Sequence, residues 1–332
     1  MRRAGRILVS ITIAAALVVG GVVFWGYKNF HAPGPLANEA TLVIPRGAGL
    51  RAIAALLEKA QVIRHQTVFV VATRLTEQHR DLKAGEYAFA PGIAPSDALT
   101  QIRDGKVVIR HVTIPEGLTS VQILEILAGT EGLDHDLTTA PPEGSLLPET
   151  FDYVLGDRSS AVVARMTAAH QEKLAALWQT RQEGLPLATP QEALILASIV
   201  EKETGVSGER PHIAAVFINR LRRGMRLQSD PTVIYAITGG KGPLGRLLSR
   251  ADLAADNPYN TYKVSGLPPG PIANPGAAAI AAVLNPLQSR DLYFVADGTG
   301  GHAFAKTLRE HNRNVAKWRR FQRQSRPPAT AN

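Results

Sequence analysis

The chain opens with a long segment that contains no charged side chain. Ile7 to Tyr27 is a run of 21 uncharged residues, which matches the roughly 20 residues that a helix needs to cross a bilayer. A cleaved signal peptide has a shorter apolar core, of about 7 to 15 residues, whereas Val22 to Trp25 extends the apolar run here. We therefore interpret residues 1–28 as a cytoplasmic tip and a transmembrane anchor, with a cleaved signal peptide as the alternative.

The charges that flank this segment predict its orientation. Arg2, Arg3 and Arg6 precede the apolar run, and only Lys28 follows it closely. Because positive residues are retained on the cytoplasmic side, the short N-terminus is expected in the cytoplasm. The rest of the chain is then exported.

The net charge is concentrated at the two ends of the chain. The formal charge is +9, of which the three N-terminal arginines supply +3 and Arg309 to Asn332 supplies +6, so residues 7–308 are balanced at zero. A balanced middle shows no net basic bias for binding phosphate, and we expect no nucleic-acid partner. The chain has no cysteine, which excludes disulfides, thiol catalysis and cysteine-ligated zinc.

A short linker and a small domain are predicted after the anchor. Residues 29–40 contain the proline and glycine residues of a linker, and residues 41–131 alternate short strand and helix patterns. Their order of strand, helix, helix, strand resembles the LysM module, which binds cell-wall glycans, and a following strand and helix complete the domain. A small spacer without a ligand is the alternative. The two strands are expected at Thr41–Pro45 and Glu86–Ala90.

The remaining chain is predicted to form a larger domain after a hinge. Residues 132–150 include a stretch rich in Asp, Thr, Pro and Gly and are interpreted as the hinge. Residues 151–322 are expected to form a mixed α/β catalytic domain, with a long amphipathic helix over 161–183. Residues 323–332 are expected to be a disordered basic tail. The predicted fold class is α+β, with an N-terminal transmembrane helix, a LysM-like α+β domain and this catalytic domain.

A buried helix is predicted in the middle of the larger domain. Thr189, Pro190 and Glu192 provide a cap, a proline at the first helical position and an acid three residues after the cap. Ala193 to Val200 then carries no charge. A helix that is apolar on every side is buried on every side.

Two acids follow this apolar run. Glu201 directly follows it, and loss of water is expected to raise its pKa toward the range of a general acid. Glu203 lies about 200° further round the helix, so the two carboxyls are not expected to serve one atom. The alternative is that either acid pairs with an arginine or is solvated at the helix end. Arg220 is predicted to neutralise Glu203 or Glu209.

Several blocks in order resemble one known family, that of the endolytic murein transglycosylases, also called YceG-like. The blocks span about residues 190–315. They are LASIVEKET from Leu196, VFINRL from Val216, GMRLQSDPTVIY from Gly224, NTY from Asn260, GLPPGPIANPG from Gly266 and LYFVAD from Leu292.

The resemblance implies an activity. Members of the family cleave the bond between N-acetylmuramic acid (MurNAc) and N-acetylglucosamine (GlcNAc) within nascent peptidoglycan strands, which leaves 1,6-anhydroMurNAc ends and limits strand elongation. By the same resemblance the catalytic acid is the first glutamate of the EKET block, Glu201. Such a lyase needs one carboxyl, which protonates the leaving oxygen and then accepts the proton of the muramoyl 6-hydroxyl, so that no water is consumed. No cofactor is implied.

The resemblance also implies a location and partners. The enzyme is expected in the bacterial cell (inner) membrane as a single-pass protein, with its catalytic domain periplasmic or extracytoplasmic. Its partners are peptidoglycan strands, with synthases or division proteins as further candidates. A peptidoglycan-binding scaffold of the synthesis or division machinery is the alternative function.

Five further polar residues are candidates for substrate binding. Gln228 is a candidate to hydrogen-bond an acetamido or hydroxyl group, and Tyr262 offers a flat face to a sugar. Asp230 is interpreted first as a helix cap before a proline. Asn260 and Asn219 complete the set. The nine histidines show no metal-site spacing, and we expect no metal.

Overall fold

The computed structural model describes residues 2–324, with side chains from Arg6. The chain divides into two compact units. Unit 1 contains the residues up to 110 together with 152–156, and unit 2 contains 111–151 and the residues from 157 on. The side chains of Arg2 and Arg3, and residues 325–332 of the predicted tail, lie outside the described part.

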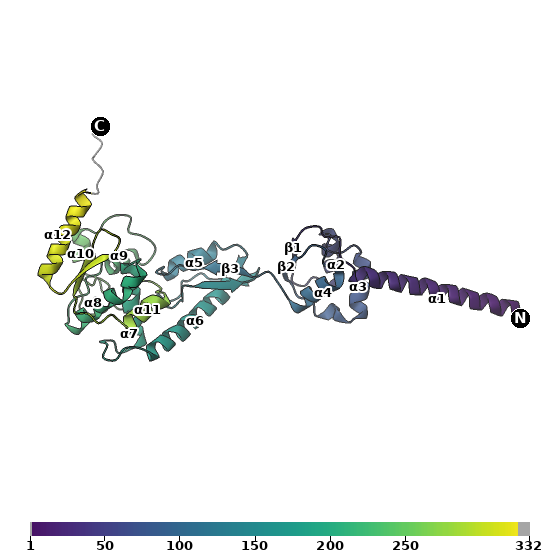
Figure 1. The fold of residues 1–332 in the computed structure, drawn as a ribbon, viewed down its shortest axis with the longest axis horizontal. Coiled ribbons are helices and arrows are strands. Elements are labelled where there is room, and N and C mark those ends of the chain that lie inside the picture. The colour runs from purple at the N-terminus through teal and green to yellow at the C-terminus, as the bar shows by residue number, and fades with distance from the viewer. Residues whose placement is uncertain (1, 325–332) are drawn as a thin grey trace, which may run out of the picture. The chain divides into compact units, whose positions relative to one another are not determined.

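Helix α1 (Arg2–His31) begins the chain (Figure 1). From Arg6 to His31 it is long and apolar enough to cross a membrane, a test that a signal sequence near the N-terminus also passes. The helix continues past the uncharged run, and the Phe30 side chain is buried in the core of unit 1, as is Leu36. The segment predicted as the linker 29–40 therefore begins as helix and packs against the domain, because it carries apolar residues that the domain buries.

Unit 1 has the predicted order of strand, helix, helix, strand, helix. Strands β1 and β2 pair antiparallel, with Leu42 opposite Tyr87. Tyr87 is fully buried beneath the helices, and Phe69 and Ile53 pack in the same core. Figure 1 shows the helices gathered around this pair. The elements are β1 (Ala40–Ile44), α2 (Leu50–Lys59), α3 (Gln66–Leu75), η1 (Gln78–Arg80), β2 (Gly85–Phe89) and α4 (Pro95–Asp104).

Unit 2 is mainly helical, with short two-stranded pieces. Strand β3 pairs with β5, β4 pairs parallel with β6, and β7 pairs antiparallel with β8. Strands β3 (Arg110–Thr113) and β5 (Thr150–Tyr153) each include residues assigned to both units. The first part of unit 2 also contains α5 (Ser120–Ala128), β4 (Leu133–Asp134), β6 (Asp157–Arg158), α6 (Ser159–Gln179) and α7 (Pro190–Glu203). The second part contains η2 (Ser207–Glu209), α8 (Arg210–Arg222), α9 (Asp230–Thr238), α10 (Arg250–Ala254), α11 (Ala277–Leu284), β7 (Tyr293–Ala296), β8 (His302–Ala305) and α12 (Leu308–Gln324).

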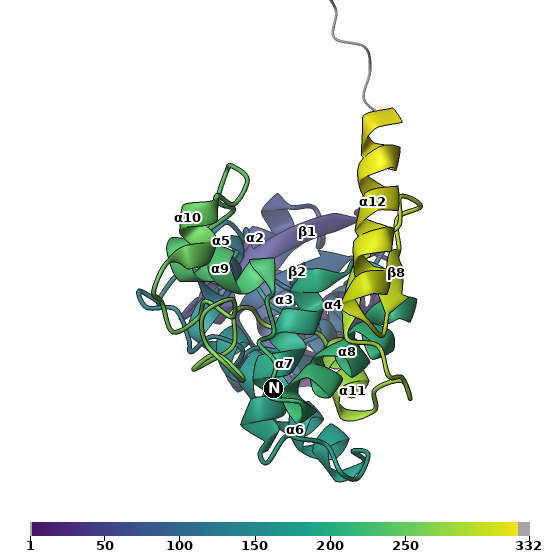
Figure 2. The ribbon, with the colours of Figure 1, turned by 90° about the vertical axis from the view of Figure 1, so that its left-hand side faces the viewer.

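The core of unit 2 is built around α7. The helix packs against α6, α8 and α11, and Figure 2 shows it beside α8 and α11. Every residue from Ala193 to Val200 is buried, as predicted from the uncharged run. The predicted start is also present, because the Thr189 side chain accepts a hydrogen bond from the Glu192 N–H. The core therefore fixes the position of whatever follows Val200.

The segment predicted as the hinge 132–150 is part of unit 2. Leu146 and Leu147 are buried, and the Leu146 N–H donates to Asn274 Oδ1 at 3.0 Å. Helix α5, which was assigned to the small domain, also belongs to unit 2. The chain is rich in loop-forming residues here, but apolar side chains and one distant amide hold it against the core.

Candidate active site

The end of α7 delivers two glutamates to two different polar clusters. The helix ends at Glu203, and Thr204 continues in an extended conformation. Glu201 and Glu203 are two residues apart, so they leave the helix in different directions. Each has its own set of partners, and the two sets differ in chemistry.

Both oxygens of Glu201 accept hydrogen bonds from the protein. Arg210 Nη2 donates to Oε1 at 2.9 Å, and the Gly276 N–H donates to Oε2 at 3.0 Å. The Glu201 side chain is only 4% exposed. Arg210 Nη2 also donates to Glu116 Oε2 at 2.9 Å, so one guanidinium serves two carboxyls. Glu201 therefore pairs with an arginine, which was the alternative to a catalytic role. In this arrangement both of its oxygens act as hydrogen-bond acceptors.

Glu203 has a different environment at the last position of α7. The Ser229 hydroxyl donates to its Oε1. Burial raises the pKa of Glu203 to about 7; the Ser229 hydrogen bond opposes this shift and the charge of Asp230 adds to it, while His302 and Arg220 oppose it more weakly. A carboxyl with such a pKa is partly protonated near neutral pH, which is the state that a general acid needs.

Two of the predicted substrate-binding residues lie next to Glu203. Asp230 is exposed, and its Oδ1 accepts a hydrogen bond from the Tyr262 hydroxyl at 2.6 Å. Burial is the largest cause of a raised pKa of Tyr262, and the bond to Asp230 adds to it, so the phenol keeps its proton. Ser229 is the N-cap position of α9, so the cap assigned to Asp230 lies one residue earlier. Asp230 is thus free to hold Tyr262.

Gln228 immediately precedes this cluster in a strained conformation. Its φ of 52° lies in the left-handed region, which residues other than glycine rarely adopt. Its N–H donates to the Thr261 carbonyl at 3.1 Å, and its side chain is exposed. Such strain persists only where surrounding contacts enforce it, and it is common at functional sites.

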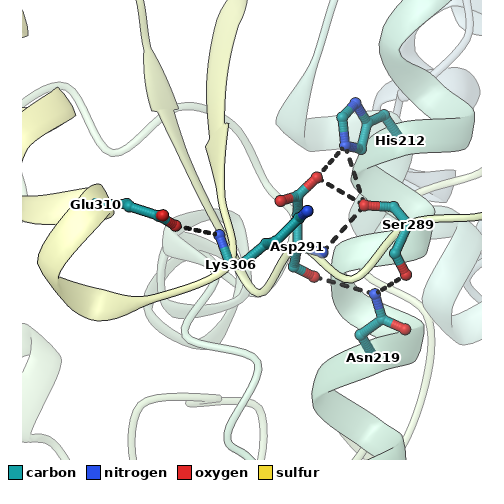
Figure 3. Close-up of polar contacts among 6 residues, drawn as sticks. All are labelled: His212, Asn219, Ser289, Asp291, Lys306 and Glu310. Atoms are coloured by element: carbon teal, nitrogen blue, oxygen red, sulfur yellow. Dashed lines mark hydrogen bonds and ion pairs between the residues drawn. The ribbon is translucent and has the colours of Figure 1, made fainter.

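Asn260 and Asn219 use their amides inside the protein. Asn260 is buried, and its Nδ2 donates to the Ala255 carbonyl at 2.8 Å and to neighbouring carbonyls at the end of α10. Asn219 Nδ2 donates to the carbonyls of Ser289 and Asp291 at 2.9 and 3.1 Å (Figure 3). Both amides therefore fasten loops. A substrate contact by either residue stays a prediction.

The neighbourhood of Asn219 also holds a Ser, a His and an Asp. Ser289 Oγ donates to Asp291 Oδ2 at 2.6 Å, and His212 Nε2 lies 2.8 Å from the same oxygen (Figure 3). In a nucleophilic triad the serine and the aspartate use opposite nitrogens of the histidine. Here both approach Nε2, and the ring stacks on Phe304 with centroids 3.5 Å apart. The trio thus ties α8 to the loop before β7.

Arg220 does not form the ion pair that the sequence predicted. Its Nε donates to the Leu292 carbonyl at 2.7 Å and its Nη1 to the Leu227 carbonyl at 2.6 Å. Glu209 pairs instead with His302, whose Nδ1 lies 2.6 Å from Oε2. Arg220 reaches Glu203 only through its longer-range charge.

Another carboxyl, the partly buried Glu143, was not singled out from the sequence as a site residue. Its Oε1 accepts from the Ser120 N–H at 2.9 Å and from Asn274 Nδ2 at 3.0 Å, while burial raises its pKa. The Ser229 contact to Glu203 was missed as well, although Ser229 stands between two residues that the sequence had singled out. Within residues 6–324, no group of three or more His, Cys, Asp or Glu is suited to a metal ion.

Comparisons with known proteins agree with the blocks found in the sequence. A model of the YceG-like family matches residues 42–317. An endolytic murein transglycosylase of Streptococcus pneumoniae strain D39 is 32% identical over 326 residues, which cover 83% of this chain and 58% of the relative. One of Bacillus subtilis is 29% identical over 335 residues and 91% of each chain.

A solved structure supports the same relationship. A crystal structure described as a YceG-like protein of Listeria monocytogenes matches with a TM-score of 0.51 and 31% identity, covering 83% of this chain and 99% of that one. The chain spans only 58% of the length of the streptococcal relative.

Proposed function

The chain belongs to the YceG-like family, and we propose from this premise that it is an endolytic peptidoglycan lytic transglycosylase that cuts MurNAc–GlcNAc bonds within glycan strands. The observation that carries the chemistry is the Glu203 cluster, in which one carboxyl with a pKa of about 7 lies beside Ser229. Strained Gln228 and the Asp230–Tyr262 pair adjoin it. Two curated relatives named endolytic murein transglycosylase support the substrate class.

We assign the proton transfers to Glu203. Protonated Glu203 donates to the glycosidic oxygen as the C1–O bond breaks and positive charge develops at C1. The resulting carboxylate then accepts the proton of the muramoyl 6-hydroxyl as that oxygen bonds to C1. The carboxyl is restored, and the product is a 1,6-anhydro end. Because the attacking hydroxyl belongs to the same sugar, no bound water and no second carboxyl are required.

This proposal moves the acid two residues from the position predicted from the sequence. Glu201 stays the prediction from family resemblance, but both of its oxygens are occupied as acceptors by Arg210 and Gly276. Glu203 accepts one hydrogen bond from a neutral hydroxyl and is partly protonated near pH 7. A general acid must release a proton, and Glu203 is the acid of this pair whose partners allow it.

A matched pair of variants tests the assignment. Glu203→Gln and Glu201→Gln are the same isosteric change on one helix. We expect Glu203→Gln to fold and to lose activity on purified glycan strands by about a hundredfold or more, the scale of general acid catalysis. Glu201→Gln is expected to keep most of the activity under conditions in which the variant is folded. The reverse result would return the role to Glu201.

The oxygen in the products tests the reaction type. Glycan strands digested in heavy-oxygen water should yield fragments whose new ends contain no solvent oxygen. Each fragment should be lighter by one water than its hydrolysed equivalent. Incorporation of solvent oxygen would mean hydrolysis, with exposed Asp230 as the second carboxyl. Release of disaccharides alone would contradict cutting within strands.

We also propose that α1 is a single-pass membrane anchor with a cytoplasmic N-terminus, so that the part of unit 1 that follows the anchor, and unit 2, lie outside the cytoplasm. The uncharged helix and the preceding arginines support this. Protease added outside spheroplasts should digest all of the chain except the anchor and the short N-terminal cytoplasmic tip. Protection of the whole chain would overturn the orientation, and recovery of a soluble chain lacking α1 would identify a signal peptide.

The role of unit 1 and of partner proteins is part of the same proposal. The antiparallel β1–β2 pair with two intervening helices supports a LysM-like, glycan-binding unit. Strand cutting near the membrane would limit the elongation of nascent glycans, with a synthase or division protein as partner. If Glu203→Gln and Glu201→Gln both left the growth and strand-length phenotype of the cell intact, the scaffold function would replace the enzyme.

A further inference from the structure

Unit 1 contains a large apolar cavity beside α1. Its volume is about 630 Å³, within the range of about 300 to 1,000 Å³ that is common for ligand pockets. The walls come from the C-terminal part of α1, from α3 and from α4. Apolar lining residues include Val22, Val23 and Tyr27 of α1 and Val68, Val71 and Leu75 of α3.

The cavity belongs to a packed arrangement of α1 and α3. The Trp25 and His65 rings lie 5.3 Å apart, and the Phe30 and Phe69 rings lie 6.3 Å apart. Phe30 and Phe69 are both buried in the core of the unit. These contacts fix α1 against α3 at two points, so the space along the two helices is held open by the fold.

Two apolar side chains that α3 contributes to the cavity are exposed. Val71 is 50% exposed and Leu75 is 80% exposed, and they are four residues apart on α3, which places them on one face. Contact of such groups with water is unfavourable by about 25 cal/mol for each Å². Their exposure is explained if an apolar molecule covers them.

We propose that this cavity holds an acyl chain of a phospholipid from the membrane in which α1 is anchored. The inference rests on the proposed anchor. Val22 and Val23 belong both to the cavity wall and to the uncharged run that would lie in the bilayer, so the cavity is continuous with the hydrocarbon region. A chain leaving the bilayer along α1 would follow this mainly apolar wall toward Val71 and Leu75.

The size of the cavity favours a lipid chain over a helix of a partner protein. A helix is at least about 10 Å wide with its side chains, so 630 Å³ accommodates about 8 Å of it, or about five residues. Such a contact is too short to seat a transmembrane helix. A thin, flexible acyl chain fills the same volume along its length.

Photolabelling of the full chain in lipid nanodiscs tests the proposal. The probe is a phosphatidylglycerol with a diazirine at the end of one acyl chain, and adducts are mapped by peptide mass spectrometry. We expect adducts on residues 67–76 of α3 in addition to those on α1. Leu75→Glu should reduce the α3 adducts at least about tenfold, the change that 1.4 kcal/mol produces, because it places a charge at the apolar wall.

Val43→Glu is the matched control. Val43 is 45% exposed in the same unit but does not line the cavity, so its replacement should leave the α3 adducts unchanged. Adducts on α1 alone in the parent chain, or α3 adducts that survive Leu75→Glu, would overturn the lipid site and leave the anchor standing. Absence of adducts on α1 as well would overturn the anchor and, with it, this inference.

Discussion

Replacement of Glu203 by glutamine should change how the stability of unit 2 depends on pH. The native pKa of about 7 lies above the ordinary value of 4.5. Between these values the native state binds more protons at this site than the unfolded state does, so the free energy of unfolding falls as pH rises. At about 1.4 kcal/mol for each pH unit, the loss is complete above pH 7 and amounts to about 3 kcal/mol. Glu203→Gln removes this loss because the amide does not titrate.

The tryptophans allow unit 2 to be followed alone. The chain has three, and Trp25 is the one in unit 1. In a Trp25→Phe background, the fluorescence of Trp178, which packs against the core of unit 2, reports urea unfolding of that unit. The drop in unfolding free energy from pH 5 to pH 8, which covers most of this range, should be about 2 to 3 kcal/mol smaller in Glu203→Gln than in the parent.

The control for this measurement is Glu201→Gln, which makes the same chemical change two residues away. It leaves the Arg210 guanidinium, which is 12% exposed, with Glu116 as its remaining carboxylate partner. Its expected effect is a loss of stability rather than the removal of this pH slope. Parallel pH profiles for the parent and Glu203→Gln would refute the argument that burial raises the pKa of Glu203.

Three further outcomes are expected. The activity, as kcat/KM, should fall about tenfold per pH unit above about 7 as Glu203 ionises, and a profile that is flat from pH 6 to 9 would contradict its role as the acid. Gly276→Ala places a Cβ 1.8 Å from Glu116 Oε1, at the end of a flexible side chain that is 40% exposed, and should cost no more than about 1 kcal/mol in urea unfolding, with most of the loss absent in a Glu116→Ala background. Asn260→Ala should lower stability by about 1 to 3 kcal/mol with KM unchanged, because its amide serves backbone carbonyls; a raised KM at unchanged stability would indicate a substrate contact.

Local sequence signals predicted the elements that hold the site. Thr189, Pro190 and Glu192 mark the start of α7, and the uncharged run after them marks a helix buried on all sides. Capping and burial depend on residues within one or two turns, so the sequence contains the necessary information. The order of elements in unit 1 was predicted for the same reason.

The partners of each carboxyl were beyond such signals. The sequence places Glu201 after an apolar run, which suggests loss of water. Its partners, Arg210 and the Gly276 N–H, are brought to it by the path of the intervening chain, which no local sequence pattern predicts. Likewise Ser229 meets Glu203 across 26 residues of chain. Helical periodicity separates the two acids by direction, whereas their protonation depends on what packs against each face.

Helix α1 continues without a break from its apolar segment into the core of unit 1. Rotation of the apolar segment about the helix axis is therefore coupled to rotation of the domain. Because Phe30 is held in the domain core three residues after Tyr27, the face that the apolar segment presents to its surroundings is fixed relative to the domain. A helix turns by about 100° per residue, so one residue inserted between Tyr27 and Phe30 would turn the apolar segment by that angle, and four would return it to within about 40°. The number of residues between Tyr27 and Phe30 therefore sets which face of the apolar segment points in a given direction relative to the domain.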